Sequence, residues 1–375
     1  MLPIHFPAAA LQEATAQALQ ATLVSDPNPR VGCVIVDARG RTLGQGHTQA
    51  AGLAHAEIMA LRAARAAGFD VRGATACVTL EPCSHHGRTP PCCDALIEAG
   101  VHRVLVARQD PNPLVAGRGI ARLRAAGIEV SVLDADDPAA LATRELNIGF
   151  FSRMIRKTPW VRMKVAASLD GKTALNNGAS QWITSEAART DGHAWRARAS
   201  AVLTGIGTVL QDNPRLDVRL VATKRQPHLV VVDSRLETPL DAHLFMAGRA
   251  LYIYAAEQND AKKSALEARG ATVIYLSGVN GKVDLAAMLR DLARREVNEL
   301  HVEAGHKLNG SLIREGLVDE FVVYLAPKLI GQGSGMASFG PISELSQAIP
   351  LEFKSIDMLG PDLRILARIP GREQF

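Results

Sequence analysis

The chain has 375 residues, more than a single hydrophobic core usually serves, so we expect two domains that each bury a core. Hydrophobic residues make up 47% of the chain, and 42 basic against 38 acidic side chains leave a formal charge of +4. This balance excludes a strongly charged chain and gives no indication of nucleic-acid or membrane binding.

Helices and strands alternate in the first half of the sequence. Ala, Leu and Gln at helical spacing predict a helix over residues 8–24, which Pro27 ends before a buried strand at 31–36. The predicted elements that follow are helix 56–67, strand 74–80, helix 92–99, strand 101–107, helix 117–126, strand 128–132 and a helix from Pro138. Such alternation predicts an α/β layer sandwich.

The second half is again α/β. Residues 148–159 carry three basic residues and a proline before a new strand, so we place the domain boundary there, between residues 1–150 and 155–375. The predicted elements are strand 161–167, helix 185–199, strands 201–204, 228–233, 250–254 and 272–275, helix 285–295, strand 299–303, helix 307–315 and strand 320–326. The halves share no long motif, so they are not a tandem duplication.

Cysteine usage and the N-terminus indicate the compartment. Of five cysteines, three crowd between Cys83 and Cys93 beside histidines, which favours metal binding in a reducing compartment over a disulfide framework. The N-terminus lacks a basic stretch followed by an apolar one, and no run approaches the length of a membrane span. We therefore expect a cytoplasmic protein.

One imidazole, two thiols and a carboxylate form a candidate catalytic zinc site. His55 precedes Glu57 by two residues, and Cys83 and either Cys92 or Cys93 follow. Catalytic zinc takes three protein ligands, for which His plus two Cys is an accepted set, and keeps one position open for water. Glu57 is then free to move protons, as the glutamate of the H-x-E motif does in zinc nucleobase deaminases. His55 and Cys92 also open predicted helices, whose positive ends favour anions.

A purely structural zinc site is the alternative. It would need a fourth protein ligand, which His85 or His86 could supply. This alternative leaves Glu57 without a role, so hydrolytic deamination is favoured. The spacing is nevertheless unusual, because eight residues separate Cys83 from Cys92 where the usual signature has two.

Pattern alone does not locate a nucleotide cofactor in the second half. Gly205 and Gly207 follow a strand, but the third glycine of a dinucleotide-binding fingerprint is missing, so a Rossmann dehydrogenase is disfavoured. The two glycines alone predict a tight turn. The run 331–335 (GQGSG) likewise reads as a mobile loop and not as a phosphate cradle.

Longer motifs in both halves resemble one family. In the first half they are Pro27–Cys33 (PNPRVGC), His55–Glu57 (HAE), Thr79–Cys92 (TLEPCSHHGRTPPC) and Asp110–Pro113 (DPNP). In the second half they are Lys164–Lys172 (KVAASLDGK), Ser180–Thr184 (SQWIT), Asp212–Pro214 (DNP) and Val302–Gly305 (VEAG). The chain resembles the bifunctional deaminase/reductase of riboflavin biosynthesis over nearly its whole length. The resemblance implies a cytidine-deaminase-like three-layer sandwich followed by a dihydrofolate-reductase-like domain.

The resemblance implies roles for residues of the first half. One zinc ion per chain would be held by His55, Cys83 and Cys92, with Glu57 as the proton carrier, and Cys93 could be a small buried thiol. Residues implied to surround the pyrimidine and its phosphoribosyl arm are Asn28, His85, Arg88, Asp110 and Asn112. Without the resemblance, Asp110–Pro113 would be read as an ordinary turn.

The second half would bind NADPH and the reductase substrate. The NADPH positions implied by the resemblance are Ala166, Trp182, Thr208, Asp212, Ser234 and the turn Gly305, His306, Lys307, Leu308, Asn309, Gly310 and Ser311. Those implied for substrate are Ser180, Arg196, Leu216, Arg219 and Glu303, and guanidinium groups suit a phosphorylated ligand. Alone, the arginines would be read as surface residues and Leu216 as core. Lys164 and Asp170 receive no role.

The function implied by the family is a two-step conversion in riboflavin biosynthesis. A zinc-dependent hydrolase step would deaminate 2,5-diamino-6-(5-phosphoribosylamino)pyrimidin-4(3H)-one. An NADPH-dependent oxidoreductase step would then reduce the ribosyl chain of 5-amino-6-(5-phosphoribosylamino)uracil to ribityl. The family also suggests homo-oligomers assembled through the reductase half. One alternative is a zinc deaminase that acts on another nucleobase or nucleotide. An aromatic content of only 4% speaks against a nucleic-acid substrate. The other alternative is a zinc-dependent regulatory protein without turnover.

Overall fold

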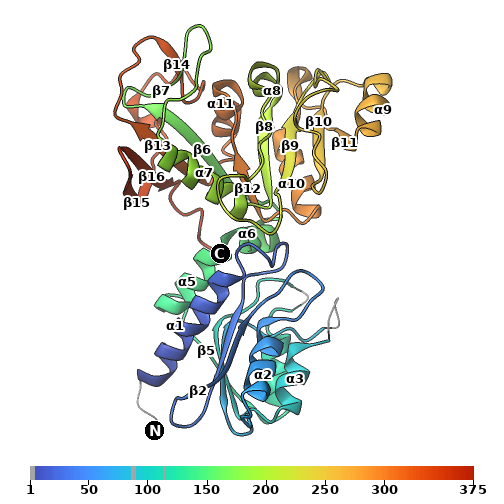
Figure 1. Cartoon of the computed structure of the whole chain (residues 1–375), viewed down its shortest axis with the longest axis vertical. Coiled ribbons are helices and arrows are strands. Elements are labelled where there is room, and N and C mark those ends of the chain that lie inside the picture. The colour runs from blue at the N-terminus through green and yellow to red at the C-terminus, as the bar shows by residue number, and fades with distance from the viewer. Residues whose placement is uncertain (1–4, 86–89, 114) are drawn as a thin grey trace. The chain divides into compact units, whose positions relative to one another are not determined.

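The computed structural model describes residues 5–85, 90–113 and 115–375. The chain divides into two compact units, the first ending at Arg156 and the second beginning at Lys157 (Figure 1). Each unit contains helices and strands with its own sheet, so the α/β class predicted from the sequence is confirmed. No helix within the described residues is both long and apolar enough to cross a membrane.

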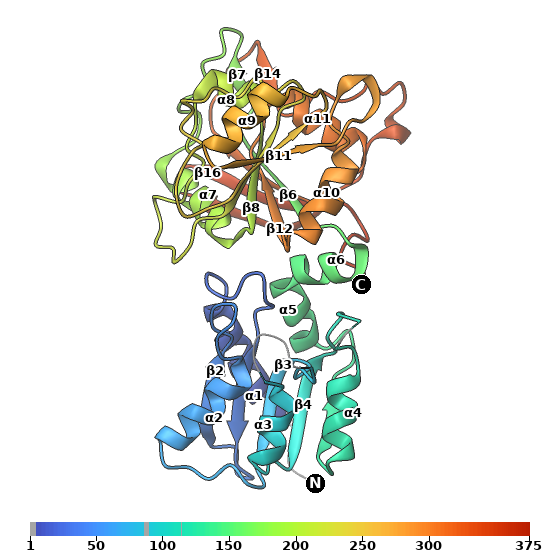
Figure 2. The ribbon, with the colours of Figure 1, turned by 90° about the vertical axis from the view of Figure 1, so that its right-hand side faces the viewer.

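The first unit is a three-layer sandwich around a five-stranded sheet. The strand order is β2 (Thr42–His47), β1 (Gly32–Val36), β3 (Thr75–Leu80), β4 (Arg103–Arg108) and β5 (Glu129–Val132). β1 runs antiparallel to its two neighbours, and β3, β4 and β5 are parallel. Helices α1 (His5–Gln20) and α5 (Pro138–Leu146) cover one face, while α2 (Ala56–Ala66), α3 (Cys92–Glu98) and α4 (Arg118–Ala125) cover the other (Figure 2).

Glycines bring two helices unusually close to the sheet of this unit. A Cβ on Gly32 of β1 would lie 1.9 Å from the backbone oxygen of Ala14 in α1. On β2, a Cβ on Gly44 would lie 2.3 Å from the backbone oxygen of Ala60 in α2. Both positions therefore require glycine, and α2, which carries two of the candidate site residues, is held directly against the sheet.

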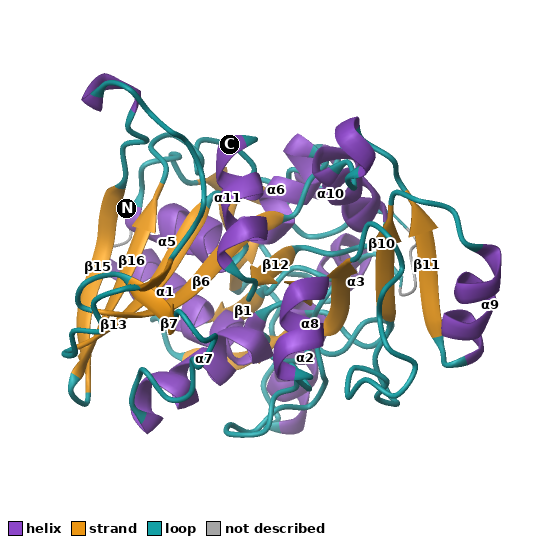
Figure 3. Ribbon diagram, turned by 90° about the horizontal axis from the view of Figure 1, so that it is seen from above, coloured by secondary structure: helices purple, strands orange, loops and turns teal. Residues whose placement is uncertain are grey.

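The second unit is built on a nine-stranded sheet. In spatial order its strands are β11 (Ala271–Tyr275), β10 (Leu251–Ala255), β9 (His228–Val232), β8 (Ala201–Gly205), β12 (Glu299–Val302), β6 (Trp160–Ser168), β13 (Glu320–Ala326), β16 (Asp362–Arg368) and β15 (Glu352–Leu359) (Figure 3). The strands from β11 to β13 are parallel, and β16 and β15 add an antiparallel edge. A small separate ribbon pairs β7 (Lys172–Leu175) with β14 (Gly333–Gly335).

Helices cover both faces of this sheet. One apolar core joins Met163 and Val165 of β6 to α10 (Leu285–Arg294) and α11 (His306–Arg314). On the other face, Val202 of β8 and Ile253 of β10 pack with residues of α8 (Ile206–Asp212) and α9 (Asp260–Ala268), and α7 (Glu186–Arg198) packs on β13. Two single-turn helices, η1 (Val279–Gly281) and η2 (Leu345–Gln347), complete the elements described.

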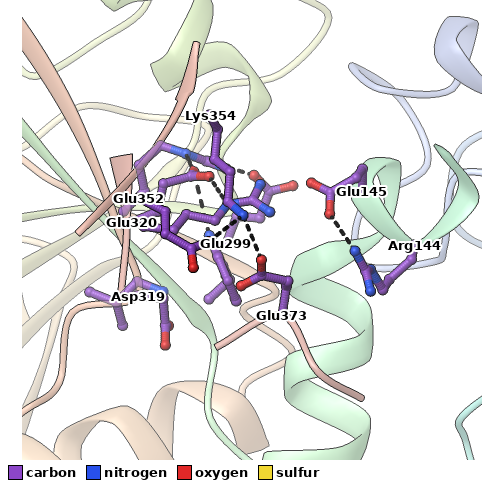
Figure 4. A network of polar contacts seen from close by, with 12 residues as sticks. Arg144, Glu145, Glu299, Asp319, Glu320, Glu352, Lys354 and Glu373 are labelled. Atoms are coloured by element: carbon purple, nitrogen blue, oxygen red, sulfur yellow. Dashed lines mark hydrogen bonds and ion pairs between the residues drawn. The ribbon is translucent and has the colours of Figure 1, made fainter. Parts of the chain in front are cut away.

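Buried charges lie between the sheet and α7. Arg162 of β6, only 2% exposed, donates to Glu320 and to Glu299, whose oxygen lies 2.7 Å from Nη1 of Arg162 (Figure 4 labels both carboxylates). The Arg162 guanidinium also lies 4.4 Å from the ring centroid of Trp195 in α7. Because removal of one partner would leave an uncompensated buried charge, this network fixes the position of α7 on the sheet.

Several elements differ from the sequence prediction. The segment expected to link the domains is largely a helix, α6 (Ile148–Arg156), so the expected boundary at residue 150 lies inside it. The run expected to be a mobile loop forms β14, and the expected glycine turn after β8 opens the short helix α8. Strands β2, β7, β15 and β16 and helix α9 were not predicted.

Candidate active sites

The ends of α2 and α3 bring together the three candidate zinc ligands. His55 is the N-cap of α2 and Cys92 is the first residue of α3, so both open helices as the sequence predicted. Cys83 lies in the loop after β3. Nδ1 of His55 lies 3.6 Å from Sγ of Cys83 and 3.4 Å from Sγ of Cys92.

The donor set suits a zinc ion. The three ligand atoms all lie within 4.8 Å of one another, and they form a group of one imidazole and two thiols. Hydrogen bonds from Cys92 and His55 lower the pKa of the Cys83 thiol, despite partial burial, and so favour the thiolate that metal binding needs. The exposed His85 is not part of this group, and His86, the other candidate for a fourth ligand, lies outside the described residues.

Glu57 lies in the first turn of α2 beside these ligands. Its side chain is 3% exposed, and burial is the main cause that raises the pKa of its carboxyl group, followed by the charge of Cys83. It also shares a hydrogen bond with the thiol of Cys92. A buried carboxyl group with a raised pKa takes up a proton more readily than an exposed one, which suits a proton carrier.

Cys93 points away from the group. Its Sγ donates to the carbonyl oxygen of Pro82 at 3.3 Å and lies 3.6 Å from that of Gly119. Burial raises the pKa of this thiol well above its ordinary value, so it stays protonated. Between the two alternatives left open by the sequence, the geometry therefore favours Cys92 as the ligand.

A residue that the sequence analysis did not assign holds this site to the neighbouring loop. The buried carboxylate of Glu81 accepts hydrogen bonds from the backbone N–H groups of Asp110, Gly117, Gly119 and Ile120, at 3.3, 2.9, 2.9 and 3.2 Å. Glu81 thus joins the strand that leads to Cys83 to the start of α4. A carboxylate directly before Pro82-Cys83 was the available signal, but its four partners are separated from it by 29 to 39 positions.

The candidate pyrimidine-binding residues have mixed surroundings. Asn28 is half-buried, and His85 is exposed in the loop after Cys83. Arg88 lies outside the described residues. Asp110 accepts a hydrogen bond from the backbone of Asn112 at 2.7 Å, which is the geometry of a turn, and burial raises the pKa of Asp110 to about 7.

In the second unit, the candidate NADPH residues lie at the carboxyl ends of parallel strands, where open α/β sheets usually bind ligands. The turns after β8 and β12 lie side by side, since a Cβ on Gly305 would be 3.7 Å from Oγ1 of Thr208. Gly305 is also the N-cap of α11 and has no side-chain cap, so backbone N–H groups are available there for a phosphate.

The remaining NADPH candidates are spread around this edge. Ser234 follows β9, and its carbonyl oxygen accepts from Ala256 at 3.0 Å, while Asp212 ends α8 and burial raises its pKa. Trp182 is 61% exposed with the guanidinium of Arg189 4.5 Å from its ring centroid, and Ala166 lies within β6. Residues His306, Lys307, Leu308, Asn309, Gly310 and Ser311 form the first turns of α11.

Two of the candidate substrate residues, Arg196 and Glu303, form an ion cluster with Lys164. Arg196 of α7 donates to both oxygens of Glu303, with Nη2 3.0 Å from Oε2, and Nζ of Lys164 lies 3.6 Å from the same oxygen. Lys164 is therefore part of the site, although the sequence analysis gave it no role. Basic residues at alternate positions of an otherwise apolar strand, Arg162 and Lys164, were the signal for it.

Two further candidates follow in the loop after α8. Arg219 donates to the carboxylate of Asp217, which also lies 3.3 Å from Nε of Arg215. Leu216 is a core residue, 5% exposed, and adopts a left-handed backbone with φ of 49°. Asp170, also left without a role, accepts from the backbone of Gly331 at 2.7 Å and so holds the loop before β14.

Comparison with known proteins gives one family match in each unit. Residues 7–108 match the cytidine and deoxycytidylate deaminase zinc-binding region, and residues 159–365 match the RibD C-terminal domain. The riboflavin biosynthesis protein RibD of Escherichia coli is 44% identical over 351 residues, which span 90% of this chain and 92% of that protein. The chain belongs to the RibD family.

Solved structures of the RibD family share the whole architecture. The structure of Acinetobacter baumannii RibD has a TM-score of 0.85 at 37% identity and covers 97% of this chain and 99% of its own. A deaminase/reductase from Thermotoga maritima, named for diaminohydroxyphosphoribosylaminopyrimidine and 5-amino-6-(5-phosphoribosylamino)uracil, has a TM-score of 0.85 at 32% identity over 97% of this chain and 99% of its own. Membership of the RibD family makes the protein a bifunctional enzyme of riboflavin biosynthesis, with a zinc deaminase and an NADPH-dependent reductase.

Proposed function

We propose that residues 1–150, extended to the end of α6, deaminate 2,5-diamino-6-(5-phosphoribosylamino)pyrimidin-4(3H)-one at the group formed by His55, Cys83 and Cys92. Zinc held by these side chains would supply an acidified water for attack on the ring carbon that bears the amine. Glu57 would carry one water proton to the ring nitrogen and then the second proton, from the hydroxyl group formed on the ring carbon, to the departing ammonia. Its burial and its place beside Cys92 support this role.

The rest of the chain, residues 155–375 in the sequence analysis, would reduce the ribosyl chain of 5-amino-6-(5-phosphoribosylamino)uracil to ribityl. NADPH at the turns of Thr208 and Gly305 would supply the hydride to the sugar carbon attached to nitrogen. Arg196 and Arg219 hold the substrate phosphate, and the Glu303 carboxylate is available for hydroxyl groups of the sugar.

The carrying observation is the placement of Glu57 beside the His55, Cys83 and Cys92 group, because ligands alone would also suit a structural zinc. The test adds the diaminopyrimidinone substrate to the zinc-loaded protein and measures ammonia release, then adds NADPH and follows its oxidation. We expect ammonia first and NADPH oxidation only after it. Ammonia release from cytidine or adenosine nucleotides at a comparable rate, without NADPH oxidation, would instead support a deaminase of different specificity.

We also propose a cytoplasmic location and a homo-oligomer assembled through the second unit. The five cysteines are free, which suits a reducing compartment. The edge strand β15 exposes Phe353, Ile356 and Met358 by 67, 56 and 63%. Large apolar side chains gathered on a sheet edge favour a contact with another protein surface, for which a second copy of the chain is the simplest occupant.

A further inference from the structure

His193 lies one helical turn before Arg196 on α7 and is 5% exposed. Its Nδ1 accepts a hydrogen bond of 3.1 Å from the backbone N–H of Arg219. A neutral imidazole has one donor and one acceptor nitrogen. Since Nδ1 is the acceptor, the proton must be on Nε2, and the loop that carries Arg219 fixes the tautomer of His193.

The protonated nitrogen of His193 faces another donor. Its Nε2 lies 3.4 Å from Nη1 of Arg196, and an arginine has no acceptor to offer. Two donors that approach each other without an acceptor leave hydrogen-bonding capacity unused in a buried place, which costs free energy. An anionic oxygen placed between them and the side chain of Arg219 would satisfy both groups.

The surroundings of His193 carry an excess of positive charge. Arg215 and Arg219 share the carboxylate of Asp217, and Nη1 of Arg249 donates to the nearby carbonyl oxygen of Leu216 at 2.8 Å. Nη1 of Arg196 donates to the carbonyl oxygen of Asp217 at 2.9 Å, and its Nε and Nη2 donate to the carboxylate of Glu303. The carboxylates thus compensate only part of the charge, which favours binding of a phosphate dianion.

We propose that His193 is a further substrate-binding residue of the reductase, which donates its Nε2–H to a phosphate oxygen of the phosphoribosyl substrate between Arg196 and Arg219. The inference rests on the proposed function, because it takes the phosphate to bind at these two arginines. It adds a third donor that neither the sequence motifs nor the family resemblance singled out.

The protonation state of His193 agrees with a donor role through one nitrogen. Burial, followed by the charges of Arg196 and Arg219, lowers the pKa of His193 to about 4, while Glu303 and Asp217 act in the opposite direction. The imidazole is therefore neutral at pH 7 and keeps Nδ1 as the acceptor for Arg219. Binding of a phosphate dianion adds negative charge beside it and would raise this pKa.

Two substitutions separate phosphate binding from a purely structural role. In His193→Asn, the side-chain oxygen occupies the place of Nδ1 and can still accept from Arg219, but the donor at the place of Nε2 is lost. In His193→Gln, the amide nitrogen reaches the place of Nε2 and can donate, whereas the acceptor for Arg219 is lost. A structural role predicts the larger defect in His193→Gln, and phosphate binding predicts it in His193→Asn.

The experiment measures reductase kinetics of the full-length, zinc-loaded enzyme. We expect His193→Asn to raise the KM for the phosphorylated intermediate by about tenfold to a hundredfold, the range for one hydrogen bond to a charged group. The KM for NADPH, the melting temperature and ammonia release should stay near the wild-type values. His193→Gln should recover most of the lost affinity.

The outcomes distinguish this inference from the proposed function. An unchanged KM in His193→Asn, or a larger defect in His193→Gln than in His193→Asn, would overturn the role of His193 if Arg219→Ala still raises the KM. If Arg219→Ala also leaves the KM unchanged, the phosphate binds elsewhere, and both the placement of the substrate and the inference are wrong.

Discussion

Arg196 of α7 and Glu303 at the end of β12, 107 positions apart in the sequence, face each other as a two-point ion pair. Burial opposes ionisation of Glu303, but the charges of Arg196 and Lys164 outweigh it and hold the pKa of this carboxyl group well below its ordinary value. Glu303 is therefore an anion at neutral pH. We therefore expect the substrate phosphate to bind away from Glu303, near the loop of Arg219.

The two arginines are expected to respond differently to truncation. Arg219→Ala removes a half-exposed side chain that forms an ion pair with Asp217, so it should raise the KM of the reductase substrate about tenfold to a hundredfold with little change in melting temperature. Arg196→Ala should raise the KM as well and also lower the melting temperature, because it leaves the Glu303 carboxylate buried without its main partner. Steady-state kinetics and thermal unfolding measure both effects.

Deamination serves as the control for both arginine variants, since every proposed zinc ligand lies in the first unit. Ammonia release should equal that of the wild type. Arg215→Ala is a matched variant, because its 59% exposed side chain also pairs with Asp217 but was not assigned to the substrate. A KM effect in Arg215→Ala as large as in Arg219→Ala would show that the response is general electrostatics and not a direct contact.

The zinc site predicts a separation of metal binding from turnover. His55→Ala and Cys83→Ala should lose both zinc and deamination, because three protein ligands are needed for a catalytic site. Glu57→Gln should keep one zinc per chain and lose at least about 10²- to 10⁴-fold in ammonia release, the usual contribution of a general acid/base. Metal analysis and an ammonia assay on the same samples test this.

Cys93→Ala is the control for the zinc prediction, since its thiol contacts the carbonyl oxygen of Pro82 and not the ligand group. It should retain zinc. Loss of zinc in Cys93→Ala together with retention in Cys92→Ala would reverse the ligand assignment, and near-normal ammonia release by Glu57→Gln would remove Glu57 as the proton carrier.

The sequence predicted the group of His55, Cys83 and Cys92 because two of these residues lie in short motifs at helix starts. His55 and Cys92 open α2 and α3 as expected, and their motifs identified them as ligands although the fold alone closes the 37 positions between them. Glu81 escaped notice because its partners belong to a loop that only the fold brings to it. Strand β2 was missed because Gly44 and Gly46, which let α2 approach the sheet, weaken the strand pattern.

The reductase site was less accessible to sequence reasoning for the same physical reason. Its ion cluster takes Lys164 from β6, Arg196 from α7 and Glu303 from β12, and neither periodicity nor spacing connects these positions. Pattern alone read Leu216 as core, and its side chain does lie in the core. Its left-handed backbone, with φ of 49°, could not be read from a leucine in the sequence.

Acid should destabilise the second unit through His301. This residue is fully buried on β12, and neither ring nitrogen has a hydrogen-bond partner among the described residues, although Nε2 lies 3.5 Å from Glu303. Burial is the main cause that lowers its pKa from 6.5 to about 3. Below about pH 6.5 the histidine therefore binds a proton in the unfolded chain but stays neutral in the folded chain. The free energy of unfolding falls as the pH drops from about 6.5 towards 3.

The slope provides the measurement. One such histidine contributes about 1.4 kcal/mol per pH unit to the loss of unfolding free energy within this window. His301→Gln, which does not titrate, should flatten the dependence of urea unfolding on pH between 6 and 4.5 by about this amount. A slope equal to that of the wild type would mean that His301 is protonated in the folded protein as readily as in the unfolded one.

Separation of the two units should preserve each chemistry if the cut respects α6. Arg153 of α6 donates to the carbonyl oxygen of Pro27 at 3.2 Å, and Arg108 of β4 lies 5.5 Å from the ring centroid of Phe151, so α6 is anchored to the first unit. Residues 1–156 should bind zinc and release ammonia, and residues 157–375 should oxidise NADPH with the deaminated intermediate.

A fragment of residues 1–150 is the matched comparison. It loses Phe151 and Arg153 and should unfold at a lower urea concentration. Its free energy of unfolding should be lower by about 1.5 to 3 kcal/mol or more, the contribution of one buried aromatic side chain. If residues 1–156 and 157–375 are both folded by circular dichroism but deamination requires them together, the two active sites are not independent, and the proposed division of the chain is wrong.

The edge of the nine-stranded sheet predicts how copies of the chain associate. On β15, Ile356 pairs with Ile365 of β16, which in turn pairs with Val323 of β13, so a row of apolar side chains crosses three strands on one face. Their alternate neighbours Leu359 and Leu366 pack with α7 on the opposite face. Ile356 and Met358 remain 56 and 63% exposed. Burial of this row against a second copy would remove it from water.

The double variant Ile356→Glu/Met358→Glu should therefore shift the protein towards the monomer in sedimentation velocity. Burial of two carboxylates in an apolar contact is unfavourable, because the contact offers them no polar partner in place of water. Val279→Glu is the control, since Val279 is 83% exposed in η1, outside this row. It should sediment like the wild type. Both variants should keep the wild-type circular dichroism spectrum. A double variant that sediments as the wild type at every concentration would exclude β15 as the contact between copies.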